Sequence, residues 1–168
     1  MEFCEVPETD IPEILLFKNS LTDVRLLMDL YYDYLFRKSF LTGNQICYPD
    51  NYTIVRAVEA HFLPTSELKA VIGNCAFYST QSRSINILSH LHVWLEWRQK
   101  YIIDLIPLDG KPGLSVPQAV FPSKHRTRFI SSPGIYAKDC SLETKKEIDL
   151  KIENLLQIFD EIMSKVPT

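Results

Sequence analysis

The sequence predicts an α+β fold with N-terminal helices, a central antiparallel sheet and a long C-terminal helix. Apolar side chains recur at three- and four-residue steps over residues 20–38, 51–62 and 144–166, which is typical of amphipathic helices. Between them, residues 68–106 change to the two-residue alternation of strands. Helices, then a meander, then a closing helix favour α+β over a parallel architecture.

The composition indicates one folded domain of ordinary size. The chain has 168 residues, 46% hydrophobic and 11% aromatic, with a formal net charge of −3. Such a chain carries enough apolar surface to fold, and its acidic balance disfavours nucleic-acid binding by charge. It contains no apolar run near the ~18 residues of a membrane helix, and its first residues are acidic, unlike a secretory signal. We therefore expect a cytoplasmic protein without a nucleic-acid or membrane partner.

Prolines divide the N-terminal part of the chain. Residues 1–19 contain two prolines and no sustained apolar period, which predicts an arm with a single helical turn, followed by one domain over residues 20–168. The first full helix is expected to begin after Ser20. It should end near Lys38, before the turn-forming residues 42–44.

A second helix and a first strand follow. Asp50 supplies a start signal for a helix over residues 51–62, and Pro64 cannot continue that helix. Residues 68–78 are rich in β-branched and aromatic side chains and predict a strand, with a bulge at Gly73-Asn74.

The clearest strand pattern is a hairpin. Residues 87–97 alternate between a face with Leu91, Val93, Leu95 and Trp97 and a face with His90, His92, Trp94 and Glu96. A polar turn at 98–100 then leads into a return strand over 101–106. Shorter strands are expected at 118–121 and 127–130.

The C-terminal helix carries the strongest helical signal. Thr144 and Glu147 have capping-box spacing, and an apolar stripe runs from Ile148 to Val166. The stripe is short for a coiled coil, so we expect this helix to pack on the core rather than to form a dimer.

The chain has four cysteines, Cys4, Cys47, Cys75 and Cys140, of which Cys47 and Cys75 are candidate nucleophiles and the other two are expected to be packing or surface thiols. No two of them form a CxxC pair, so a zinc site is not indicated, and free thiols are the default in a reducing cytosol. Cys47 directly precedes a predicted helix, whose N-terminus favours the reactive thiolate. Cys75 is the rival nucleophile, but it falls inside a predicted strand.

His92 and Asp104 could complete a catalytic group with Cys47. An imidazole can take the thiol proton and later return it to a leaving amine, while a carboxylate holds the other ring nitrogen. A turn near residues 98–99 would bring His92 and Asp104 within reach across the hairpin, although a register slip of one residue would separate them.

These residues also carry a resemblance to a known family. The runs His92–Glu96 (HVWLE) and Tyr101–Pro107 (YIIDLIP) resemble the second half of the transglutaminase-like superfamily signature. That signature has His-x-Trp-x-Glu on one strand, and an aromatic residue, two apolar residues, Asp, two residues and Pro on the next. In that family a cysteine at the start of a helix precedes these strands, and Cys47 matches its place in the chain order. The resemblance therefore covers about residues 45–107.

The resemblance implies a papain-like α+β scaffold and a thiol-dependent activity. Cys47 would be the nucleophile, His92 the base and acid, and Asp104 the orienting carboxylate. Gln45 could donate to an oxyanion, and Trp94 would lie close to the catalytic strand. We therefore expect acyl transfer on peptide or side-chain amides, with a peptide or protein substrate and with neither a metal nor another cofactor.

Three alternative interpretations remain open. The domain could be a catalytically inactive interaction module that binds through its C-terminal helix or its basic residues 124–128. That basic cluster could contact a phosphate backbone or an acidic partner. His90, His92 and Glu96 could instead form a metal site.

Overall fold

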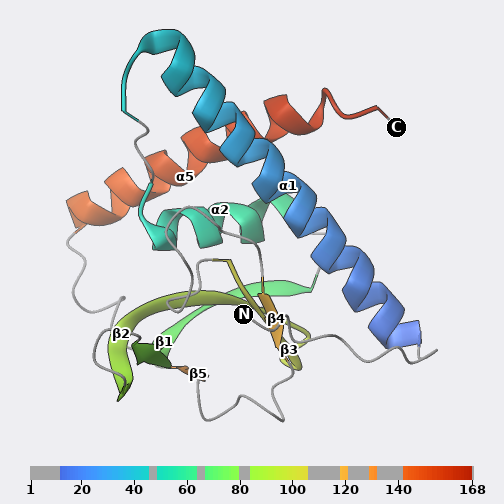
Figure 1. Ribbon diagram of the computed structural model, residues 1–168, viewed down its shortest axis with the longest axis vertical. Helices are drawn as coiled ribbons and strands as arrows, with labels where there is room; N and C mark the ends of the chain where they lie inside the picture. Colours follow the sequence, from blue (N-terminus) through green and yellow to red (C-terminus); the bar gives the residue numbers. More distant parts are fainter. Residues whose placement is uncertain are drawn as a thin grey trace.

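The computed structural model confirms the predicted α+β architecture of N-terminal helices, an antiparallel sheet and a C-terminal helix (Figure 1). It describes residues 12–45, 49–63, 67–79, 84–105, 118–120, 129–131 and 142–167. The helices are α1 (Pro12–Thr42), α2 (Asn51–Phe62) and α5 (Leu142–Met163). The strands are β1 (Leu68–Ser79), β2 (Ser84–Trp97), β3 (Tyr101–Asp104), β4 (Gln118–Val120) and β5 (Phe129–Ser131).

Helix α1 is longer at both ends than the sequence predicts. It begins at Pro12 rather than after Ser20. Proline is well tolerated in the first helical turn, because the backbone N–H that it lacks would have no partner within the helix there. Phe17, inside the expected arm, is fully buried. The helix continues past Lys38 to Thr42 and ends at Gly43, whose φ of 66° is the left-handed conformation that closes many helices.

Helix α2 has the predicted bounds and a clear physical start. Asp50 is its N-cap, and its carboxylate accepts hydrogen bonds from the Thr53 backbone N–H (2.9 Å) and the Thr53 hydroxyl (2.8 Å). The cap occupies one of the otherwise unpaired amides of the first turn. The same helix end follows the segment that contains Cys47.

Asp50→Ala is expected to lower the free energy of unfolding by about 1 kcal/mol, because the first turn of α2 loses its capping acceptor. Urea denaturation followed by circular dichroism measures the change. Asp33→Ala is the matched control, since Asp33 is an exposed carboxylate that pairs with Arg37 on the surface, and its loss should cost less than about 0.5 kcal/mol. Equal effects of the two substitutions would contradict the assigned cap.

The sheet is antiparallel, with strand order β4-β3-β2-β1-β5. Strand β1 pairs with β2 from Leu68↔Trp97 to Gly73↔His92, and the register then shifts between Gly73 and Cys75. The irregularity lies at the predicted position, but the extra residues belong to β2, where residues 89–91 stand opposite Asn74 of β1. Pairing continues to Ser79↔Ser84, so β2 begins earlier than the alternation alone indicated.

The β2–β3 turn sets the hairpin register. Arg98 and Gln99 both have positive φ, and the Lys100 N–H donates to the Trp97 carbonyl at 3.0 Å, as in a type I′ turn. The Arg98 side chain bonds the Glu67 carboxylate and lies over the Trp97 ring, 4.4 Å from its centroid. These contacts hold two non-glycine residues in a conformation that usually favours Gly or Asn.

One face of the sheet packs against the helices, which all lie on the same side in Figure 1. The sheet contributes Val93, Leu95 and Trp97 from β2 and Ile103 from β3 to this core. The apolar stripe of α5 packs in the same core through Leu155, Phe159 and Ile162. This confirms the predicted core-packing role of the helix. No helix in the described part of the chain is long and apolar enough to cross a membrane.

Candidate functional site

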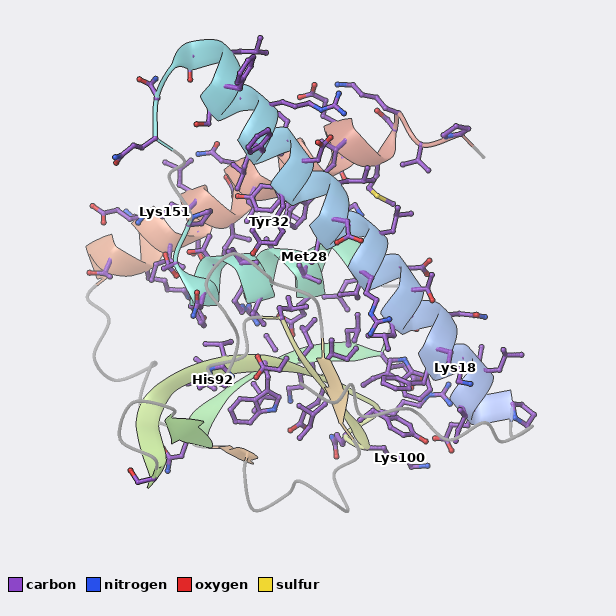
Figure 2. All side chains as sticks on the ribbon, viewed as in Figure 1. Lys18, Met28, Tyr32, His92, Lys100 and Lys151 are labelled. Atoms are coloured by element: carbon purple, nitrogen blue, oxygen red, sulfur yellow. The ribbon has the colours of Figure 1, made fainter. Side chains whose placement is uncertain are left out.

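A buried histidine–carboxylate pair lies on the sheet face opposite the helices. His92 Nε2 and Asp104 Oδ2 are 2.9 Å apart, and the two side chains are only 1% and 3% exposed. His92 lies on the curved strand β2, as labelled in Figure 2. Burial at this level excludes water from the hydrogen bond. A buried pair is screened less than an exposed pair and therefore holds its geometry more strictly.

The strand register explains why these two side chains meet. Leu95 pairs with Ile103, so Trp94 lies opposite Asp104 and His92 is the diagonal neighbour two residues along β2. Diagonal neighbours on one face of an antiparallel pair lie within reach of long side chains. Val93 and Leu95 alternate with His92 and Trp94 and face the helical core instead.

Trp94 connects the pair to a second carboxylate. Its side chain is fully buried, and its ring stacks near the His92 ring with centroids 6.1 Å apart and planes 26° apart. Its indole Nε1–H donates to Glu96 Oε1 at 3.1 Å. Four side chains on two strands thus form one array: Glu96, Trp94, His92 and Asp104.

Several predicted site residues are not part of the array as far as the structure describes it. Cys47 is outside the described residues, whereas Gln45, two positions earlier, is described and exposed. The basic residues 124–128 are also outside the described part. Cys75 and His90 belong to β1 and β2 by backbone, but their side chains are not among those described. The predicted roles of these residues therefore stay predictions.

The geometry of β2 argues against the metal site built on His90, His92 and Glu96. A strand rises about 3.3 Å per residue, so His92 and Glu96 are separated by about 13 Å, too far to share one ion. Glu96 already accepts from Trp94, and His92 bonds Asp104. Among the side chains that the structure describes, no group of three His, Cys, Asp or Glu could hold a metal ion.

Glu96 is the residue whose place in the site the sequence reasoning missed. The sequence places Glu96 in the family signature and offers it a role only as an alternative metal ligand, whereas the structure pairs it with the Trp94 indole. The available signal was the two-residue spacing of His92, Trp94 and Glu96, which puts all three on one strand face.

Comparison with protein-family models, with curated proteins and with solved structures finds no match to this chain. The fold class and the site therefore rest on the residues and the geometry described above.

Proposed function

We propose that this protein is a cysteine-dependent acyl-transfer enzyme that acts on peptide or side-chain amides. The buried His92–Asp104 hydrogen bond is the observation that carries the proposal. A carboxylate that accepts from Nε2–H fixes the imidazole tautomer and leaves the lone pair on Nδ1. Nδ1 is then the atom that can take a proton from a thiol.

The proposed reaction uses Cys47 as the nucleophile. His92 Nδ1 removes the Sγ proton, and the thiolate attacks the amide carbonyl carbon to give a tetrahedral oxyanion. When the C–N bond breaks, the imidazolium returns the proton to the leaving amine and a thioester remains. Water or a second amine then attacks the thioester and releases Cys47. The exposed side-chain amide of Gln45 is the proposed donor to the oxyanion.

The proposal makes a specific demand on the chain before α2. The buried side of α2, including Ile54 and Val58, packs in the same core as Val93, on the face of the sheet opposite His92. The segment that precedes the Asp50 cap must therefore carry the Cys47 sulfur past the sheet edge to Nδ1 of His92.

Differential alkylation tests this proposal. At pH 7, iodoacetamide is expected to modify Cys47 at least about tenfold faster than Cys4 or Cys140, because an activated cysteine is mostly thiolate and an ordinary one is not. His92→Ala should reduce the Cys47 rate to that of the other two. His61→Ala is the matched control, since His61 lies on α2 and pairs with Asp160 at 3.3 Å, away from the array.

Equal alkylation of Cys47 and the other two cysteines would refute the activated thiolate. It would leave the second candidate, a transglutaminase-like domain that binds a partner without turnover. The near-complete burial of His92 favours that candidate, because a substrate must reach this ring for catalysis. An interaction module would keep its partner after His92→Ala, whereas an enzyme would lose turnover of a peptide amide.

A further inference from the structure

We propose that Glu96 is a positioning residue that acts through Trp94 to fix the plane of the His92 imidazole. This inference deepens the proposed function and rests on it for the chemical role of His92. It stands on the two contacts of Trp94, the stack against His92 and the hydrogen bond to Glu96.

The need for such a residue follows from how a histidine side chain rotates. The χ2 torsion of histidine is broad, with no sharp staggered minima. By itself, the bond to Asp104 holds one atom of the ring and does not fix the plane of the ring. A flat neighbour stacked along the ring restricts this swing and so sets the direction of Nδ1.

Trp94 can serve as that neighbour only if its own plane is fixed. Its side chain has no exposed surface, and a buried indole N–H requires an acceptor. Glu96 supplies the acceptor from the same face of β2, and its half-buried position leaves it at the rim of the array. Loss of the Glu96 carboxylate would leave the indole N–H without this acceptor, and the ring would tilt to find another.

The experiment compares Glu96→Ala with Glu96→Gln, whose amide oxygen can accept the same hydrogen bond. Nitrogen-15 shifts of the His92 ring, read through its carbon-bound protons, report the tautomer directly. Glu161→Ala is the matched control, because Glu161 is also a glutamate bonded to a side chain, Lys165, but lies on α5 and outside the hairpin.

Wild type and Glu96→Gln are expected to show one tautomer, with the proton on Nε2. In Glu96→Ala a rotated His92 ring would weaken its hydrogen bond to Asp104, so the two nitrogen shifts should move toward each other. Alkylation of Cys47 should then slow by about tenfold, which corresponds to the free energy of one ordinary hydrogen bond. Trp94→Phe keeps a ring to stack but has no N–H, so adding Glu96→Ala to it should change neither readout further.

Two results would overturn the inference. One is a Glu96→Ala protein whose His92 shifts match those of Glu161→Ala; the other is an equal effect of Glu96→Ala in the Trp94→Phe background. If Glu96→Ala alone does not fold, the comparison of Trp94→Phe with the Trp94→Phe, Glu96→Ala double variant still tests the inference. If Cys47 of the wild type is unreactive while the His92 shifts respond as expected, the proposed function fails and the positioning role of Glu96 stands.

Discussion

Phe17→Ala is expected to lower the free energy of unfolding by about 3–5 kcal/mol. The Phe17 side chain is fully buried, stacks on Tyr101 with centroids 4.3 Å apart and lies 5.6 Å from the Trp97 ring. Truncation removes a large apolar side chain from the junction of α1 with the β2–β3 hairpin and leaves a cavity there. Urea denaturation followed by tryptophan fluorescence measures the loss.

Leu15→Ala is the matched control for this prediction. Leu15 lies on the same helical turn but is 61% exposed, so its truncation should change the stability by less than about 0.5 kcal/mol. If the two substitutions cost the same, residues 12–20 would be an arm rather than a packed part of α1. The pair therefore distinguishes the sequence-based expectation from the observed helix.

The elements that the sequence predicts well are those with local signals. The Asp50 cap and Pro64 in the sequence bracket α2, and a glycine at position 73 marks the place in β1 where the register with β2 shifts. The start of α1 was missed because proline was interpreted as a breaker, although Pro12 fits the first turn of a helix. What identifies residues 12–20 as core is the contact of Phe17 with Tyr101, which is distant in sequence.

The same distinction applies to the site. Period-two alternation is sufficient to place His92, Trp94 and Glu96 on one face. The distance between His92 and Asp104 also depends on the register, which the turn at Arg98-Gln99 sets. Neither residue is a usual positive-φ residue, and the turn is held by Glu67, which lies far from it in the sequence. Sequence patterns therefore indicate the pair, while only the tertiary contact with Glu67 explains its register.

A double-mutant cycle is expected to show that His92 and Asp104 are strongly coupled. Asp104→Leu should lower the free energy of unfolding by about 3 kcal/mol, because it leaves the buried Nε2 without the carboxylate that accepts from it. His92→Leu should cost a similar amount by leaving the Asp104 carboxylate buried without the imidazole. The double variant should cost less than the sum of the two single substitutions, since neither member of the pair is then left buried without the other.

Equilibrium unfolding of the four proteins measures the coupling, and the exposed pair Lys165–Glu161 at the end of α5 provides the reference, with a much weaker expected coupling. Additive effects at His92 and Asp104 would contradict the buried hydrogen bond itself. Strong coupling together with a stable double variant would show that apolar residues could fill this face of the sheet equally well. Stability would then not explain why His92 and Asp104 occupy these positions. The remaining physical explanation would be the one that the proposed function requires, an imidazole held in one tautomer whose Nδ1 can accept a proton.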